Sequence, residues 1–214
     1  VIVSGHQIEV TTIRQEIGYS DGRHPDQVIF GADILKDLAR RDFTINAIAY
    51  DFITAQLIDP FQGRRDLYRR ILKAVGKPQA RFREDGLRML RFYRFLATLD
   101  LHPAYATKWA INPEWSAPVS GERMRDELGK LLLGKHVRLG LEGLLRSGLL
   151  KEFLPEVADL NSSREVHSRH RWRLWEHTVI AVSSIKPQLH LRLAALLHDI
   201  AKPNTRLVNQ SGVH

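Results

Sequence analysis

The signals for β-structure in this chain all lie before residue 77, and segments with helical periodicity follow them. In the first part, the alternating residues 7–14 predict a strand, and residues 48–52 and 56–59 predict a hairpin. A first helix is predicted over 33–47. Further helices are predicted over residues 81–100, 121–133, 137–147, 172–184 and 189–202. The expected fold class is α+β.

Turn-forming residues and prolines divide the chain further. Residues 18–26 are dense in Gly, Ser, Asp and Pro and predict a loop. Gly76 and Pro78 close the mixed part. We therefore predict three regions, over residues 1–76, 77–138 and 139–214.

The net charge of +8 favours a polyanionic partner such as nucleic acid, although simple solubility would account for it equally well. The basic, His-rich residues 161–173 are interpreted as a mobile linker or an RNA contact. The absence of cysteine excludes disulfides and thiolate metal sites. No apolar run approaches a membrane span, so a cytoplasmic location without a membrane partner is expected. Because the chain starts at Val1, it is expected to be a piece of a longer polypeptide.

Asp85 and Arg88 are three residues apart in a segment that reads as helical, so they are expected on one face. Their simplest interpretation is a surface ion pair. The alternative is a template for a base, because the carboxylate accepts a hydrogen bond from an exocyclic amino group and the guanidinium donates to ring nitrogen and carbonyl acceptors. Cytosine and adenine present that amino group. Uracil and guanine present a carbonyl there, which leaves polar groups unpaired.

Three motifs follow one another along the chain: residues 40–47 (RRDFTINA), 59–67 (DPFQGRRDL) and 83–88 (REDGLR). In order and spacing they resemble the class II tRNA nucleotidyltransferase family, which comprises the CCA-adding enzymes and the bacterial poly(A) polymerases. The resemblance covers most of the chain. It implies a truncated, palm-type nucleotidyltransferase head with a mixed sheet, followed by an all-helical neck and body.

The resemblance also implies roles for residues of the first and third motifs. Arg40, Arg41 and Asp42 would hold the phosphates and the sugar of the nucleotide. In that role, Asp42 would distinguish ribonucleotides by their 2′-hydroxyl. Asp85 and Arg88 would take the base-template role.

The residues around Asp85 and Arg88 carry further expectations. Glu84 is expected to brace Arg88, four residues on. Arg91 and Arg94 are expected to contact phosphates, with a solvated basic face as the alternative. Gly86 stands where the family usually has Pro, which implies a looser entry into the helix.

Nucleotidyl transfer uses two divalent metal ions held by carboxylates, and oxygen ligands suit Mg²⁺. In the family these carboxylates come from an Asp-x-Asp pair that follows a Gly-Gly motif, and neither is present in this sequence. The resemblance therefore implies that the main Mg²⁺ ligands lie upstream and that this segment is inactive alone. Glu9 stands where a further acidic residue of the catalytic centre is expected. Its alternative is a solvated strand residue.

Two more segments resemble family features. Residues 14–30 resemble the flexible loop that matters for switching from C to A, through Arg14, Tyr19, Asp21 and Arg23. The loop is intact here, which favours full CCA addition or addition of the final A alone. Residues 120–123 (SGER), with Glu127 and Leu128 after them, resemble a neck motif with a supporting role.

A further motif belongs to a different chemistry. Residues 196–203 (LLHDIAKP) resemble the HD phosphohydrolase signature, with His177 upstream as its first histidine. Two imidazoles and an aspartate make a site for a divalent transition metal. The predicted ligands are His177, His198 and Asp199, with a structural His-Asp pair as the alternative. An active site of this kind would remove phosphate from damaged tRNA ends.

The predicted function is template-independent CCA addition to tRNA. The tRNA 3′-hydroxyl attacks the α-phosphate of CTP and then ATP, and pyrophosphate is released. A poly(A) polymerase or an A-only adding enzyme is the alternative within this chemistry. From other classes, an HD-type phosphohydrolase and a tRNA-binding fragment without catalysis stay open.

Overall fold

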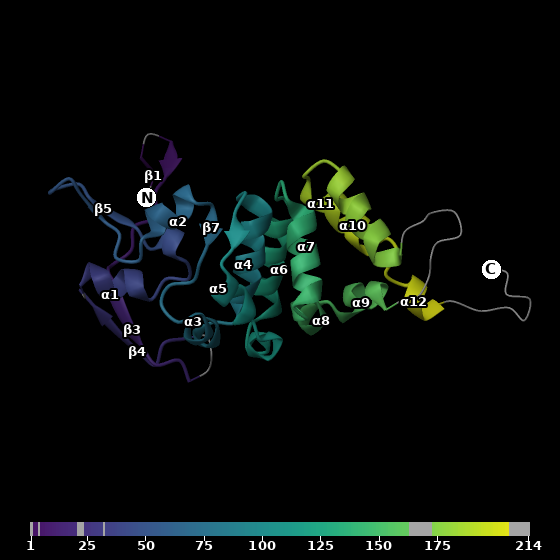
Figure 1. Cartoon of the computed structure of the whole chain (residues 1–214), viewed down its shortest axis with the longest axis horizontal. Coiled ribbons are helices and arrows are strands. Elements are labelled where there is room, and N and C mark those ends of the chain that lie inside the picture. Colours follow the sequence, from purple (N-terminus) through teal and green to yellow (C-terminus); the bar gives the residue numbers. More distant parts are fainter. Residues whose placement is uncertain (1, 4, 21–23, 32, 163–172, 206–214) are drawn as a thin grey trace, which may run out of the picture.

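The computed structural model of this protein describes residues 2–3, 5–20, 24–31, 33–162 and 173–205. The predicted loop residues Asp21 and Arg23, and most of segment 161–173, lie outside these residues. The molecule is elongated, with the strands of the first part at one end and the last helices at the other (Figure 1). None of the helices in the described part has the length and apolar character that a membrane span requires.

Within the described residues, the strands form four separate two-stranded pairs. Three pairs are antiparallel: β1 (Ile2–Val3) with β2 (His6–Gln7), β3 (Arg14–Ile17) with β4 (Gln27–Phe30), and β5 (Ala49–Asp51) with β6 (Gln56–Ile58). The β5–β6 hairpin confirms its prediction. The α+β fold class is also confirmed.

The strand predicted over residues 7–14 is wrong. Only Gln7 and Arg14 belong to strands, and residues 8–13 between them have no regular structure. Val10 on one face is 76% exposed and Ile13 on the other is 40% exposed, so neither face of the alternating segment is covered. Alternation predicts an extended backbone, but a strand also needs a neighbouring strand and a buried face.

The helix predicted over 33–47 is also shorter than expected. Helix α1 (Ile34–Ala39) starts where the Asp33 side chain accepts a hydrogen bond from the Leu35 amide (3.1 Å), and Arg40 caps its end. Phe43 then has an extended backbone and is fully buried, before the 3₁₀ helix η1 (Thr44–Asn46). The extended backbone at Phe43, which places its side chain in the core, ends the helical segment.

Among the described residues after 76, helices are the main secondary structure. Helices α6 (Gly121–Leu132), α7 (Val137–Arg146) and α10 (Leu174–Ser184) follow their predictions closely. Helix α11 (Leu189–Leu197) ends earlier than predicted, and the helix predicted over 81–100 divides into α3 (Pro78–Glu84) and α4 (Leu87–Thr98). The remaining helices are α2 (Gly63–Tyr68), α5 (Tyr105–Trp109), η2 (Pro113–Ser116), α8 (Leu149–Phe153), α9 (Pro155–Ala158), η3 (Asp159–Asn161) and α12 (Lys202–Thr205).

The first part is joined to the helical part by a parallel strand pair. Strand β7 (Ile71–Leu72) pairs with β8 (His102–Pro103), which corrects the expectation that strands end before residue 77. The Ala74 amide also donates to Thr107 Oγ1 (3.0 Å). The two parts are therefore linked by backbone hydrogen bonds as well as by packing.

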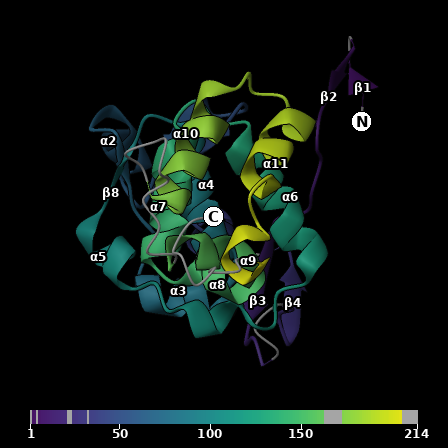
Figure 2. The same ribbon diagram turned by 90° about the vertical axis from the view of Figure 1, so that its right-hand side faces the viewer.

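The larger of two hydrophobic clusters in the described residues runs through both parts, and the smaller one, of Leu38, Ala47 and Val75, lies within the first part. The larger core extends from Phe43 and Leu72 to Leu196, and Figure 2 looks onto its α10–α11 end. Helix α4 packs against α6 and α7, and α10 packs against α7 and α11. Because this core crosses both predicted boundaries, the division at residues 76 and 138 stays a prediction.

Candidate nucleotide-binding site

An open cleft of about 540 Å³ lies between the first part of the chain and helices α4 and α6. All the predicted nucleotide-binding residues except Arg94 line it. The lining residues are Arg40, Arg41, Asp42, Asn46, Asp85, Leu87, Arg88, Arg91, Phe95 and Arg123. The cleft combines five arginines with two carboxylates, so its charge suits a phosphorylated ligand.

Arg40 and Arg41 enter the cleft from the end of α1, and Asp37 holds both of them. Arg40 Nη2 lies 2.7 Å from Asp37 Oδ1, and Arg41 Nη2 lies 3.2 Å from Asp37 Oδ2. Glu16 gives Arg40 a second partner at 2.9 Å. The Arg41 side chain keeps 43% of its surface exposed. Both guanidinium groups are therefore oriented before any ligand arrives.

Asp42 is buried at the bottom of the cleft. Its Oδ1 accepts from the Phe43 amide (2.8 Å) and from Asn46 Nδ2 (3.0 Å), and its Oδ2 lies 2.6 Å from Arg91 Nη2. Asp42 was predicted to bind the ribose and Arg91 a phosphate. The structure pairs them with each other, and both still line the cleft.

Asp85 and Arg88 do not form the predicted pair on one helix face. Asp85 ends α3 with an extended backbone (φ −152°, ψ 106°), and α4 starts after Gly86. The sequence predicted one continuous helix here, because the apolar residues have helical spacing on both sides of the break. Asp85 and Arg88 nevertheless line the same cleft.

Arg88 is held by three acceptors. Its Nη1 donates to Glu84 Oε2 (2.6 Å) and to the Arg81 carbonyl (3.0 Å), and its Nη2 donates to the Arg40 carbonyl (2.9 Å). The contact with Glu84 confirms the predicted brace. A guanidinium has five N–H groups, so two of them remain for a ligand.

Gly86 is required by close packing, which corrects the expectation of a loose helix entry. A Cβ at this position would lie 2.0 Å from the carbonyl oxygen of Trp115 and 2.7 Å from its carbon. The backbone of η2 therefore lies directly against the start of α4. This contact fixes the position of the neighbouring Asp85 relative to α6.

Gly86→Ala is expected to lower the free energy of unfolding by about 1–3 kcal/mol, because backbone atoms have to move apart. Gly121→Ala is the matched control, since a Cβ there meets nothing within 4 Å. It is expected to be neutral or to stabilise by up to about 1 kcal/mol. Urea denaturation followed by circular dichroism measures both. Equal midpoints for the two variants would contradict this account of Gly86.

Arg94 lies beneath the cleft and does not line it. Its Nε is 2.8 Å from Glu127 Oε2, and its guanidinium stacks 3.7 Å from the centre of the Phe95 ring. Glu127 is itself buried and also faces Arg91 at 3.6 Å. Burial lowers the pKa of Arg94, while the charge of Glu127 opposes this shift. The supporting role expected for the neck motif fits this position of Glu127.

The second motif supports the first. Asp59 Oδ1 and Oδ2 accept from the amides of Gly63 (2.6 Å) and Arg64 (3.0 Å) at the start of α2. Asp66 Oδ2 accepts from Thr44 Oγ1 (2.8 Å). A Cβ on Gly63 would lie 2.0 Å from the Thr44 carbonyl oxygen. The short loop after Asp42 is thus packed directly on α2.

The β3–β4 hairpin carries the described residues of the predicted flexible loop. Arg14 Nε donates to Glu16 Oε1 (2.8 Å), and the Tyr19 hydroxyl donates to Glu16 Oε2. Burial and the hydrogen bond to Glu16 raise the pKa of Tyr19, and the charges of Arg88 and Glu84 also act on it. Because Glu16 of this hairpin contacts Arg40, which lines the cleft, the hairpin lies beside the cleft.

Glu9 lies outside the cleft. It is exposed in the irregular segment between β2 and β3, which the alternating pattern had placed in a strand. Its catalytic role stays a prediction.

Acid is expected to weaken the fold through the carboxylates of this site. Burial by itself raises the pKa of Asp42, but the charge of Arg91 and the hydrogen bonds from Asn46 and Phe43 outweigh it, so the pKa falls below its ordinary 3.8. The pKa values of Glu16 and Asp37 are also lowered. A lowered folded-state pKa stabilises the fold above the unfolded-state value, and this stabilisation is lost as the pH falls through the folded-state value.

The free energy of unfolding should therefore be nearly constant above about pH 5 and should decrease below about pH 4. Arg91→Met removes one partner of Asp42 and should reduce this decrease, whereas Arg125→Met on the exposed side of α6 should leave it unchanged. Urea titrations at a series of pH values measure the slope. A slope that is the same in all three proteins would contradict the role of Arg91.

Two family profiles match the chain. One is described as the poly(A) polymerase head domain and matches residues 1–73, and the other is described as a probable RNA- and SrmB-binding site of polymerase A and matches residues 117–160. A CCA-adding enzyme of Streptococcus gordonii is 41% identical over 214 residues, covering 94% of this chain and 53% of that protein. The chain belongs to the tRNA nucleotidyltransferase and poly(A) polymerase family.

Solved structures of tRNA nucleotidyltransferases agree with this assignment. The CCA-adding enzyme of Bacillus stearothermophilus in complex with CTP is 31% identical, with a TM-score of 0.65, and the match covers 94% of this chain and 52% of that one. A tRNA nucleotidyltransferase complexed with a primer tRNA and an incoming ATP analogue is 25% identical, with a TM-score of 0.53, over 72% and 50% of the two chains. The present chain spans about half the length of these relatives.

tRNA nucleotidyltransferases generally use a divalent metal ion. In the part of this chain that the structure describes, only one group of three or more His, Asp or Glu ligand atoms comes together, and it does not lie in the first part. The described head residues therefore do not provide a carboxylate cluster for such an ion. No catalytic step through a metal follows from them.

The one group consists of His177, His198 and Asp199, whose ligand atoms all lie within 4.8 Å of one another. His177 Nε2 is 3.3 Å from His198 Nε2, and Asp199 Oδ2 is 3.2 Å from His198 Nε2. The structure thus brings together all three residues that the sequence assigned to a metal. Lys202 Nζ lies 2.7 Å from the same Asp199 oxygen.

Sequence reasoning missed several residues of the cleft. Leu87 and Phe95 resemble ordinary core positions, and Asn46 was given no role in binding although it belongs to the first motif. Arg123 was assigned only a supporting role, although it lines the cleft and contacts Asp85. The motif that Arg123 shares with Glu127 marked it as a residue of interest. Nothing in the sequence indicated that its partner would be Asp85.

Proposed function

We propose that this chain forms the nucleotide-selecting part of an enzyme that adds CCA to the 3′ ends of tRNA from CTP and ATP, with release of pyrophosphate. The observation that carries this proposal is the presence of Asp85 and Arg88 in one cleft with Arg40, Arg41 and Asp42. The similar enzyme solved with CTP and the similar enzyme solved with tRNA and an ATP analogue support it. A cytoplasmic location belongs to the same proposal, since tRNA is the substrate.

The geometry supports selection of C and A in the following way. The Asp85 carboxylate accepts a hydrogen bond from the exocyclic amino group of the base. The two remaining N–H groups of Arg88 donate to the neighbouring ring nitrogen and, in cytosine, to the carbonyl oxygen. Uracil and guanine place a carbonyl oxygen against the Asp85 carboxylate. Because both groups are acceptors, the contact leaves them unpaired and disfavours these nucleotides.

The arginines at the end of α1 provide the phosphate contacts. Arg41 is the more exposed of the two, so its guanidinium is available to a triphosphate oxygen while Asp37 keeps it in place. Asp42 and Arg91 face the same cleft as a pair. In this proposal a ribose hydroxyl joins that pair as a third partner.

The first test is binding of CTP, ATP, UTP and GTP to the chain by isothermal titration calorimetry. CTP and ATP are expected to bind on the order of 100-fold more tightly than UTP and GTP, because the wrong bases leave buried polar groups unpaired. Equal affinities for the four nucleotides would overturn the proposal.

The second test separates CCA addition from its alternatives. The protein that carries this chain is supplied with labelled CTP and ATP and with tRNAs that end before CCA, after CC and after CCA. C and A on the first, A on the second and nothing on the third are expected. A added only after CC would mean an A-adding enzyme, and long A tails would mean a poly(A) polymerase.

A second function is favoured by the cluster of His177, His198 and Asp199. Three ligand atoms around one point are sufficient to hold a divalent transition metal, and neutral imidazole is a good ligand for it. We propose a metal site here, at which the HD-type resemblance would place phosphate removal from tRNA ends. Lys202 is then a competing cation for Asp199, so Lys202→Met should strengthen metal binding.

Addition of Mn²⁺, Co²⁺ or Ni²⁺ is expected to raise the unfolding temperature of the chain, and a chelator should reverse the effect. The His198→Ala variant should lose the response. His190→Ala is the matched control, because His190 is an exposed histidine of the preceding helix outside the cluster. An equal response from both variants would mean that the metal binds elsewhere.

A further inference from the structure

We infer that Arg123 determines base selection by holding the Asp85 carboxylate in position. The inference rests on the proposed function and deepens it, since it concerns the same cleft. Arg123 acts here as a positioning residue, because it acts on the base through Asp85. It lies on α6, in a different part of the sequence from the two residues of the predicted base template.

The contact between Arg123 and Asp85 is bidentate. Arg123 Nη2 lies 2.7 Å from Asp85 Oδ2, and Nη1 lies 3.3 Å from Oδ1. The Leu87 amide also donates to Oδ1 (3.1 Å). Oδ1 therefore has two donors and Oδ2 has one, which leaves acceptor capacity on Oδ2 for the amino group of a base.

Asp85 depends on Arg123 because the other template residue cannot hold it. Arg88 is fixed by Glu84 and by the carbonyls of Arg81 and Arg40. Asp85 itself sits at the break between α3 and α4, so no helix restrains its backbone on both sides. Without Arg123, only the Leu87 amide would orient the carboxylate, and rotation of the carboxylate would turn a different oxygen toward the cleft.

Arg123 is distinguished from its neighbours on α6 by where it lies. Its side chain is 30% exposed and lines the cleft with Asp85 and Arg88. The Arg125 side chain is 74% exposed and faces Asp126, whose side chain is 57% exposed. Arg125 thus has the same residue type, helix and kind of partner as Arg123, without access to the base site. It provides a matched control.

The experiment measures the ratio of the dissociation constants for UTP and CTP in the chain and its variants by calorimetry. Arg123→Met is expected to reduce the preference for CTP by about tenfold, which corresponds to the loss of one charged hydrogen-bonded contact of about 1.4 kcal/mol. Arg125→Met is expected to leave the ratio unchanged. Arg123→Lys keeps the charge but not the bidentate geometry, and an intermediate loss is expected.

A double variant tests whether Arg123 acts through Asp85. In an Asp85→Ala background, adding Arg123→Met is expected to change the UTP/CTP ratio by less than about twofold, because the carboxylate that Arg123 positions is then absent. A merely structural effect of Arg123 would persist in that background. Circular dichroism and thermal unfolding show whether each variant is folded, and Arg123→Lys decides the outcome if Arg123→Met does not fold.

The outcomes separate this inference from the proposed function. A wild-type chain with no preference between CTP and UTP would overturn both. A selective wild-type chain whose preference is kept in the Arg123 variants would overturn this inference and leave the proposed function standing. An equal loss of CTP preference in Arg123→Met and Arg125→Met would also overturn this inference. The loss would then result from removing a positive charge from α6 and not from the contact with Asp85.

Discussion

Asp85→Asn is expected to shift the nucleotide preference of this chain from CTP toward UTP by on the order of 100-fold. In aspartate, both side-chain oxygens are acceptors. In asparagine, one of these positions is a carbonyl oxygen that accepts, and the other is an NH₂ group that donates two hydrogen bonds. The Leu87 amide needs an acceptor at the Oδ1 position, so the amide oxygen is expected there and the NH₂ group at the Oδ2 position. The NH₂ group then faces the cleft, where it accepts no bond from cytosine and donates to the uracil carbonyl.

Calorimetry with CTP and UTP measures this shift, and Asp126→Asn is the control. Asp126 is an exposed carboxylate on α6 outside the cleft, so its replacement should not alter the ratio. Thermal unfolding shows whether Asp85→Asn remains folded, since Arg123 loses part of its bidentate contact. Weaker binding of both nucleotides by the same factor would mean that Asp85 supports the cleft without reading the base.

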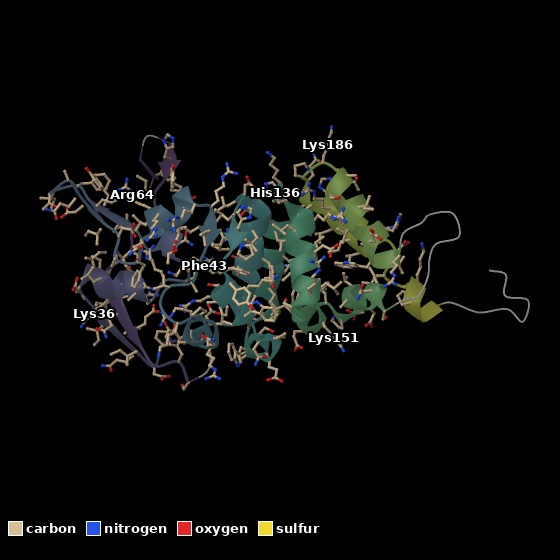
Figure 3. All side chains as sticks on the ribbon, in the orientation of Figure 1. Lys36, Phe43, Arg64, His136, Lys151 and Lys186 are labelled. Atoms are coloured by element: carbon tan, nitrogen blue, oxygen red, sulfur yellow. The ribbon has the colours of Figure 1, made fainter. Side chains whose placement is uncertain are left out.

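Phe43→Ala is expected to lower the free energy of unfolding by about 3–5 kcal/mol. Phe43 is fully buried where the first part of the chain meets α4, and it is labelled in Figure 3. Its ring centre lies 5.5 Å from that of Phe95 and 6.1 Å from that of Phe92. Removal of the ring leaves a cavity directly beside Asp42 and beneath the cleft, so CTP binding should weaken as well.

The matched control for this variant is Phe52→Ala. Phe52 is 88% exposed in the β5–β6 hairpin, so its removal should change the free energy of unfolding by less than about 0.5 kcal/mol. Urea denaturation gives the unfolding free energy of each protein, and calorimetry gives the affinity for CTP. A Phe43→Ala protein as stable as Phe52→Ala would contradict the proposed junction of the two parts.

The features that sequence predicted best are local ones. The Glu84–Arg88 contact was predicted from a spacing of four residues, although Glu84 ends α3 and Arg88 belongs to α4. The long helices α6 and α7 follow from apolar periodicity. Six of the cleft residues were predicted with the help of the family resemblance: Arg40, Arg41, Asp42, Asp85, Arg88 and Arg91. The break at Asp85 was not predicted, because it results from the packing of the Trp115 backbone against Gly86 and leaves the apolar spacing intact.

The features that sequence could not predict depend on residues far apart in the chain. The Arg123–Asp85 contact joins positions 38 residues apart, and the Asp42–Arg91 contact joins positions 49 apart. The residue types allow many pairings of arginines with carboxylates, and only the tertiary fold selects among them. The irregular segment 8–13 shows the same limit, since a strand depends on a neighbour that a pattern does not specify.

Two of the three hydrogen bonds that hold Arg88 end on main-chain carbonyls, those of Arg81 and Arg40. A main-chain acceptor does not depend on the identity of its residue. Substitutions at positions 40 and 81 can therefore accumulate during evolution without removing these bonds, provided that the backbone keeps its course. Deletions or insertions between residues 40 and 88 would remove them even where every motif residue is retained. For these two bonds, the length of the chain between residues 40 and 88 matters more than the identity of the residues that supply the carbonyls.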